Sequence, residues 1–579
     1  MLSLLRDLPV FATRDLTKSV SLAMLEGICL GLPYGLFIHL VQQLVNGNPD
    51  ASTILMTTLA IATILLFRAF ITRMSIVHTG TITYTTCAAL RESLAGHFFK
   101  VPLGFFEQHD SGRLSQSMNK DVEFTESIFS HHFAQVIASI SLLVTVAVCL
   151  LIYDWRLAVS LLAGVPIAVL LQVTMRHQAN RVSQNLLQQI ATNNRSIMDW
   201  ILGIRDIKQS GNGAALFPKL QATIEKTRQT SLRHEIRVGL VPVLFILFSE
   251  AGFLVFLLVG LDLYFSQHVE LSVFLVFLIA SVRIYRSLTQ VALTMAESRF
   301  MQQAAKRITA LLDSDPIQTD EQDIAIQGTV SVRHLSFRYP GRAQPVLEQI
   351  NFEARPGTLT AIVGPSGSGK STLLHLLARF WQVERDQIQY DGHSIHAFSD
   401  AALYRQVALV SQDIHLLDDT VFNNLSLVRP ELTKDEIYRA CHMAQCHDFI
   451  CQLPQGYDTQ IGEAGGAISG GEKQRIALAR AILSDARVIL LDEISAALDV
   501  RNEAALLNLL AELKQDKTLI SISHRESMVT HADQVIYLVH GQQEGAATHQ
   551  QLLAQRPDYR QFWHHQLTEP APVREPCRE

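Results

Sequence analysis

The sequence predicts a membrane α-helical domain with six transmembrane helices and long cytosolic extensions, fused to an α/β domain that contains a phosphate-binding loop (P-loop). Three observations lead to this fold class. Hydrophobic residues make up 48% of the 579-residue chain and gather into long runs in its first half. The connections between these runs differ strongly in basic charge. In the second half, a complete glycine-rich loop stands between a strand-like and a helix-like segment.

Six segments are apolar and long enough to cross a bilayer, whose hydrocarbon core of about 30 Å requires about 20 helical residues. They cover 19–45, 53–77, 133–153, 156–176, 239–263 and 271–292. An alternative interpretation, buried helices of a large soluble protein, does not explain the charge of the connections.

The short connections, 46–52 and 266–270, contain no Lys or Arg, whereas the long connections, 78–132 and 177–238, are rich in both. By the positive-inside rule, the long connections, both chain ends and the P-loop lie in the cytoplasm. The long connections keep a helical composition, so we expect the membrane helices to continue into the cytosol.

These patterns predict four parts: a transmembrane domain at 1–312, a linker at 313–327, a nucleotide-binding domain at 328–563 and a flexible tail at 564–579. The net charge of −6 and the lack of a basic stripe argue against nucleic acid as a partner. The seven cysteines are odd in number and spread over both halves, which indicates free thiols instead of a disulfide framework.

The P-loop follows the apolar segment 359–363 and precedes a helix-forming segment, the context that phosphate binding requires. Lys370 is expected to neutralise the β- and γ-phosphates of ATP, and the hydroxyl of Ser371 to reach Mg²⁺. A merely structural glycine loop would not need this context. The loop comprises Gly364, Pro365, Ser366, Gly367, Ser368, Gly369, Lys370, Ser371 and Thr372.

A second apolar strand, 488–491, ends in Asp492 and Glu493. Because parallel strands deliver their carboxyl ends to the ligand crevice, Asp492 is expected to hold Mg²⁺ and Glu493 to act as general base toward water. The alternative is a pair of structural acidic residues at a strand end.

With Ile468, Ser469, Gly470, Gly471 and Glu472 between these elements, the chain resembles an ATP-binding cassette (ABC) half-transporter of the exporter fold. The resemblance covers nearly the whole chain. It implies that Ser469, Gly470 and Gly471 bind the γ-phosphate of ATP held by the opposite subunit.

The resemblance assigns further nucleotide-site residues. It implies that Tyr339 stacks on adenine, that Gln412 senses Mg²⁺, that His524 contacts the γ-phosphate, and that Asp499 belongs to the nucleotide site. Ile468 and Glu472 stand where Leu and Gln are common, and Ile494 where Pro is common. Since these departures spare every catalytic group, we expect a competent ATPase with ATP and Mg²⁺ as cofactors.

The resemblance also implies a multi-pass protein of the bacterial inner membrane that dimerises, as a homodimer or with a similar half. It places coupling helices, which transmit motion to the membrane domain, at 112–122 and 203–212. Membrane lipids and an amphipathic small molecule are the other expected partners.

For the substrate, 444–456 and 462–466 resemble the yersiniabactin-type siderophore importers, which implies import of an iron-siderophore by alternating access. Three alternatives stay open: an exporter or flippase of lipid, drug or peptide, a cassette-regulated channel or receptor, and a cytosolic regulatory ATPase. Of the charged residues Glu26, Arg68 and Glu250 within the spans, Glu250 is the candidate for a cavity-facing role, with helix packing as the competing explanation.

One segment invites a metal interpretation. Cys441, Cys446 and Cys451 are interspersed with His442 and His447. Cysteines five apart rotate around a helix instead of converging, however, and zinc sites use closer pairs. We therefore expect a helical subdomain and not a metal site in this segment.

Overall fold

The structure is a computed structural model that describes residues 13–45, 51–109, 111–211, 213–429, 431–462, 468–494 and 500–568. It divides into two compact units. The membrane unit comprises Met1–Phe99 and Ser111–Ser314, and the nucleotide-binding unit comprises Lys100–Asp110 and Asp315–Glu579. Each unit is described by itself.

All secondary structure elements in the described residues of the membrane unit are helices, and six of its segments are long and apolar enough to cross a membrane, as the sequence predicts. Its long helices are α2 (Thr13–Val45), α3 (Ala51–Phe98), α7 (Ala134–Tyr153), α8 (Trp155–Leu162), α9 (Gly164–Leu202), α11 (Gly213–Phe265) and α12 (Leu271–Leu312). Short helices connect them: α5 (Ser111–Gln116), η1 (Ser117–Asp121), α6 (Val122–Ser127), η2 (Ile128–Phe133) and α10 (Ile204–Gln209).

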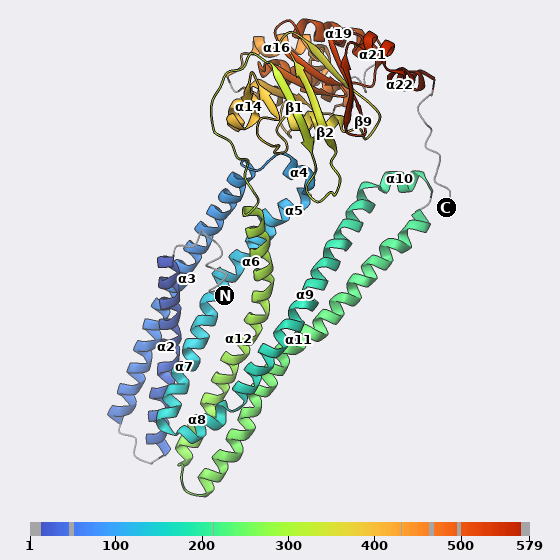
Figure 1. Ribbon diagram of the computed structural model, residues 1–579. Coiled ribbons are helices and arrows are strands. Elements are labelled where there is room, and N and C mark those ends of the chain that lie inside the picture. Colours follow the sequence, from blue (N-terminus) through green and yellow to red (C-terminus); the bar gives the residue numbers. More distant parts are fainter. Residues whose placement is uncertain are drawn as a thin grey trace. The chain divides into compact units, whose positions relative to one another are not determined.

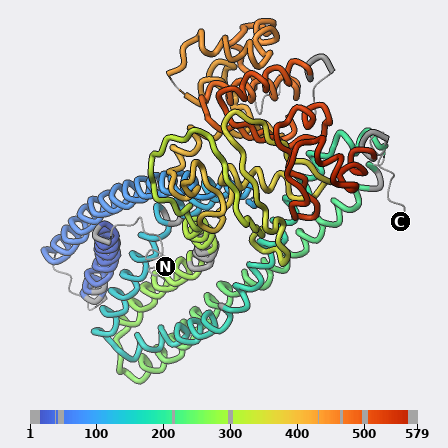
Figure 2. Tube along the Cα trace, turned by 45° about the horizontal axis from the view of Figure 1, so that its top comes forward, coloured from blue at the N-terminus to red at the C-terminus, as the bar shows by residue number. Residues whose placement is uncertain are grey.

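Several of these helices run far beyond a single membrane span. Helix α11 has 53 residues, and at 1.5 Å per residue it is much longer than a hydrocarbon core of about 30 Å. Helices α9 and α11 lie side by side in both views and are joined by the short α10 (Figures 1 and 2). The expected helices longer than one membrane span are therefore present, and the cytosolic location of their extensions stays a prediction.

An ion pair with a buried carboxylate joins two helices of this unit. Both oxygens of the fully buried Asp121 accept hydrogen bonds from Arg307, at 2.8 Å from Nε and 2.6 Å from Nη2. This bidentate geometry ties η1 to α12.

The nucleotide-binding unit is built on a ten-stranded sheet with the order β5-β4-β1-β2-β10-β9-β3-β8-β7-β6. Its strands are β1 (Val330–Phe337), β2 (Leu347–Ala354), β3 (Leu359–Val363), β4 (Ile388–Tyr390), β5 (His393–Ser394), β6 (Val407–Val410), β7 (Val488–Asp492), β8 (Thr518–Ile522), β9 (Gln534–Val539) and β10 (Gln542–Ala547). Strands β9, β3, β8, β7 and β6 pair in parallel, and the β1 side is antiparallel.

The central strands β3, β7 and β8 are buried along their whole length, which explains their continuous apolar runs. Alternate side chains of β7 enter different cores: Ile489 and Leu491 pack into one, Val488 and Leu490 into the other. Because β3, β8 and β7 pair in parallel, their carboxyl ends lie at the same end of the sheet, where the site is located.

The helices of this unit follow the sheet on both faces and form a helical subdomain around α16 to α18 (Figure 1). They are α4 (Gly104–Gln108), α13 (Lys370–Leu377), η3 (Ile395–Ala397), α14 (Asp400–Gln406), α15 (Val421–Ser426), α16 (Lys434–Met443), α17 (His447–Gln452), η4 (Gly456–Asp458), α18 (Gly470–Leu483), α19 (Val500–Leu513), α20 (Glu526–Thr530), α21 (His549–Gln555) and α22 (Pro557–Thr568). Helix α22 continues past residue 564, where the sequence analysis begins the tail, and 569–579 lie outside the described residues.

Candidate functional site

The P-loop joins β3 to α13, as expected from the sequence. Gly364 has φ 155°, and a Cβ at this position would lie 2.0 Å from the carbonyl oxygen of Leu538. Only glycine fits so close to another backbone. The loop leads directly into the N-terminus of α13, where free N–H groups and the helix dipole favour an anion.

Lys370 is the first residue of α13 and is buried. Its Nζ donates hydrogen bonds of 2.9 Å to the carbonyl oxygens of Gly364 and Pro365. Burial lowers the pKa of Lys370, while Glu493 and Asp492 oppose this effect. The ammonium group thus lies against the loop that is expected to hold phosphate.

Glu493 connects three loops of the site. Its Oε2 accepts a hydrogen bond from Nε2 of Gln412 at 3.2 Å, and its Oε1 lies 3.1 Å from Nε2 of His524. Burial is the main cause that lowers the pKa of His524, and the Glu493 carboxylate opposes this effect. The predicted base and both predicted sensor residues are therefore in direct contact.

The residues expected at Mg²⁺ also share one space. Ser371, Gln412 and Asp492 line a cavity of about 900 Å³. Oδ1 of Asp492 is buried and has no hydrogen-bond partner among the described residues. Burial raises the pKa of this carboxyl, and a divalent cation would offset that cost. These oxygen donors fit Mg²⁺, and these three residues would hold it.

Tyr339 contacts the P-loop instead of this carboxylate cluster. Tyr339 places its Oη 3.0 Å from Oγ1 of Thr372 and packs edge-on against Trp381, at a centroid distance of 5.4 Å. Adenine stacking on Tyr339 stays a prediction. Asp499 lies outside the described residues.

The signature residues start a different helix. Ser469 caps α18, and Gly470 and Gly471 form its first turn. Ser469 and Glu472 form a reciprocal capping box, so the glutamate that replaces the common glutamine still satisfies the helix end. None of the three signature residues lines the cavity that contains Asp492. Their action on a nucleotide of the opposite subunit stays a prediction.

The segment predicted as the first coupling helix, 112–122, lies in the membrane unit, to which Ser111–Gln116 and the following helices belong. Instead, α4 packs within the nucleotide-binding unit, where the N–H of Gly104 donates to the carbonyl oxygen of Phe380 at 2.9 Å. The predicted second segment, 203–212, contains α10, and residue 212 lies outside the described residues.

Helix α4 reaches the nucleotide site through a side-chain contact. Oε1 of Glu107 lies 3.2 Å from Nδ1 of His375 on α13, the helix that begins with Lys370. Glu107 and His375 line the same cavity as Asp492. Sequence spacing could not reveal this link, because the two residues are far apart along the chain.

We expect Gly104→Ala to uncouple ATP hydrolysis from transport. A Cβ at residue 104 would lie 2.1 Å from the ring of Trp381. Overpacking of this kind costs about 1–3 kcal/mol, so the docked fraction of α4 should fall about tenfold. Transport and ATPase rates measured in the same vesicles give the coupling ratio. Gly96→Ala is the control, since a Cβ there meets open space. Equal ratios for both variants would contradict the assignment of α4.

A second cavity, the arginine pocket, lies within the membrane unit between α2, α3 and α12. It has a volume of about 490 Å³ and is lined by Leu30, Pro33, Tyr34, Phe37, Ile61, Leu65, Arg68, Ile279 and Arg283. Nε of Arg68 and Nε of Arg283 are buried without a hydrogen-bond partner among the described residues. Two guanidinium groups in an apolar wall favour an anionic group with an apolar body.

The arginine pocket differs from the site that the sequence suggests. Glu250 is exposed on α11 and does not line it, whereas Arg68 does. Glu26 accepts a hydrogen bond of 3.0 Å from Oγ1 of Thr72, a contact between α2 and α3. The charge in this pocket is therefore positive, not negative.

Comparison with known proteins supports both halves of this description. The family model for the ABC transporter transmembrane region matches residues 19–287, and the model described as ABC transporter matches residues 347–496. The ATP-dependent lipid A-core flippase of Salmonella paratyphi A is 30% identical over 523 residues, which are 89% of each chain. The flippase of the same name from Escherichia coli is 29% identical over the same length.

A solved structure shares the fold of the whole chain. It is described as a bacterial Atm1-family ABC exporter with ATP bound, and it superposes with a TM-score of 0.80 at 23% identity. The alignment covers 96% of this chain and 99% of the exporter. These similarities do not support the siderophore-importer subfamily, and the flippases correspond to the alternative that the sequence left open.

Proposed function

This chain belongs to the ABC transporter family, and we propose that it is a half-transporter that flips or exports a lipid-like amphipath with an anionic head group. It is a multi-pass membrane protein that couples ATP hydrolysis to translocation. We place it in the bacterial inner membrane, as a dimer of two copies or of one copy with a similar half.

The observation that carries the substrate class is the arginine pocket. Arg68 and Arg283 combine two positive charges with an apolar wall inside the membrane unit. Charges within a membrane span are costly, so they are expected to face a cavity or a charged partner. The names of the flippase relatives supply independent support for a lipid.

The chemistry of ATP hydrolysis in the nucleotide-binding unit follows from the contacts of Glu493. Glu493 is placed to accept a proton from water while Gln412 and His524 hold its carboxylate in position. Lys370 and the α13 N-terminus neutralise the phosphates. Glu107 and α4 pass movement of this site toward the membrane helices. This complete set of residues favours a transporter over a cassette-regulated channel.

We expect the double substitution of Arg68 and Arg283 by Gln to weaken stimulation of the ATPase by anionic lipids, with basal hydrolysis unchanged. A hydrogen bond to a charged group contributes about 1.5–3 kcal/mol, so the stimulating lipid concentration should rise at least about tenfold. The assay titrates phosphatidylglycerol and lipid A against purified protein in neutral detergent.

Arg73→Gln serves as the control, because Arg73 is an exposed arginine of the same helix α3 outside the pocket. Unchanged stimulation in the double variant would reject the arginine pocket. Stimulation by a ferric siderophore, without stimulation by anionic lipid, would favour import.

A further inference from the structure

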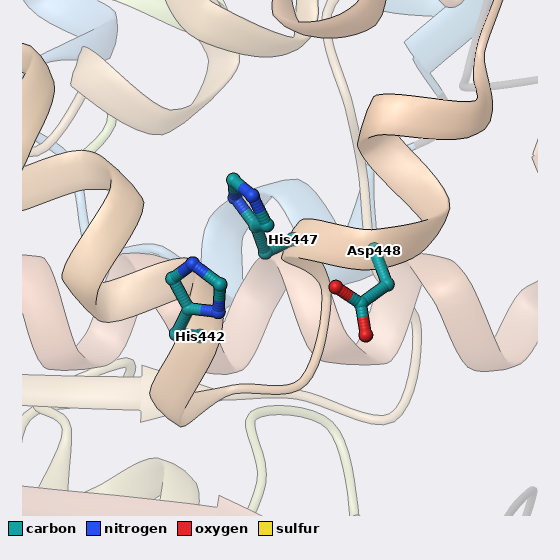
Figure 3. Close-up of side chains that lie close together, drawn as sticks. All are labelled: His442, His447 and Asp448. Atoms are coloured by element: carbon teal, nitrogen blue, oxygen red, sulfur yellow. The ribbon is translucent and has the colours of Figure 1, made fainter.

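A cluster of side chains of the types that can bind a metal lies where α16 ends and α17 begins, away from the nucleotide cavity. Ligand atoms of His442, His447 and Asp448 all lie within 4.8 Å of one another. Figure 3 shows His442 on one helix end facing His447 and Asp448 on the next helix. The turn between α16 and α17 thus brings together residues whose proximity is not evident from their spacing in the sequence.

His447 is held by contacts at both ring nitrogens. Nδ1 lies 2.9 Å from Oη of Tyr457, and Nε2 lies 3.4 Å from Sγ of Cys451. When Nδ1–H donates to Tyr457, the lone pair of Nε2 points toward Cys451. Metal-binding histidines are oriented in this way by a partner at the second nitrogen.

His447 and Cys451 stand four residues apart on α17, so their side chains share one face. A tetrahedral zinc ion with Zn–N of about 2.0–2.1 Å and Zn–S of about 2.3 Å separates the two ligand atoms by about 3.6 Å. The observed 3.4 Å is close to this spacing. Cys451 is exposed, so an ion can reach its thiol and displace the proton.

Two further donors cluster with His447, while Cys451 joins the group through its contact with His447. The rings of His442 and His447 stack at a centroid distance of 3.8 Å, and His442 is exposed. Asp448 is exposed in the first turn of α17. Nitrogen, sulfur and carboxylate ligands together favour a borderline transition metal over Mg²⁺ or Ca²⁺.

The other two thiols of the segment take no part. Cys441 and Cys446 are fully buried in the core of this subdomain. The sequence argues against a metal in this segment because the three cysteines do not converge, whereas the arrangement in the structure centres on His447 and Cys451.

We propose that His442, His447, Asp448 and Cys451 form a site for a divalent transition metal, with Zn²⁺ as the best match. The His447–Cys451 pair provides the core of the site, and His442 ties α16 to α17. The subdomain also carries α18, where Arg475 lies over the ring of Phe449 from α17 at 5.4 Å. Zinc thus binds next to the signature helix without entering the nucleotide site.

The test uses the full-length protein without a polyhistidine tag, in excess Mg²⁺. Calorimetric titration with Zn²⁺ should give one ion per chain with a micromolar or lower Kd. Co²⁺ in place of Zn²⁺ should produce a thiolate-to-metal absorption band. His447→Ala and Cys451→Ser should each weaken Zn²⁺ binding at least tenfold, and Cys451→Ser should remove the band.

Cys149→Ser and His531→Ala are the controls, because these residues lie outside the cluster. All four variants should keep the wild-type ATPase rate without zinc, which shows that they fold. The proposal is overturned by a lack of Zn²⁺ binding, by a cobalt complex without the thiolate band, or by wild-type Zn²⁺ affinity in His447→Ala or Cys451→Ser.

Discussion

Glu493→Gln should reduce ATP hydrolysis by about 10²–10⁴-fold while Mg·ATP still binds, because general-base catalysis contributes a factor of that size. The amide fills the same space between Gln412 and His524 but cannot accept a proton from water. The variant should therefore accumulate ATP-bound dimers instead of turning over.

The measurement pairs phosphate release with equilibrium binding of a fluorescent ATP analogue. Glu512→Gln is a matched control, since Glu512 is an exposed glutamate on α19 and takes no part in the cavity. Turnover of Glu493→Gln within a few fold of the wild type would remove Glu493 from the role of base.

Ser469→Arg should abolish hydrolysis in the dimer without weakening ATP binding to the same chain. Ser469 caps α18 and does not line the cavity that contains Ser371 and Asp492. An arginine there would occupy the place expected for the phosphate of the opposite subunit. The loss of hydrolysis should equal that of Lys370→Ala. The cause differs, because Lys370→Ala removes the positive charge at the phosphates and lowers ATP affinity.

Mixed dimers separate these two roles. A dimer of one Lys370→Ala chain and one Ser469→Arg chain has one site with both defects and one intact site if the signature acts on the opposite nucleotide. Co-purified mixed dimers should therefore regain hydrolysis that neither homodimer shows. If Ser469 serves its own chain, both sites stay defective and no activity returns.

The sequence was informative where short-range chemistry decides the structure. The run before Gly364 had to form a buried strand, and the apolar lengths of the six spans had to be helical in a bilayer. These predictions agree with β3 and with the six long apolar helices. The P-loop residues follow from their local context in the same way.

Contacts between distant segments were not predictable. Gly104 gives no local signal that a tryptophan ring would lie against it, so the sequence favours 112–122 for the coupling helix and gives no reason to choose α4. Within the spans, depth alone favoured Glu250, whereas the rotation of α3 and α12 brings Arg68 and Arg283 into one pocket. The likeness of 444–456 and 462–466 to siderophore importers could not identify the substrate, because the arginine pocket is lined by residues of the membrane unit.

The most direct test is ATP-driven movement of a head-group-labelled anionic lipid in proteoliposomes. The account predicts that the wild-type protein moves the lipid between leaflets only with Mg·ATP. Movement should stop with Glu493→Gln and weaken strongly when Arg68 and Arg283 are both replaced by Gln. Full ATP hydrolysis without movement of any anionic lipid, in vesicles that take up a ferric siderophore, would contradict it.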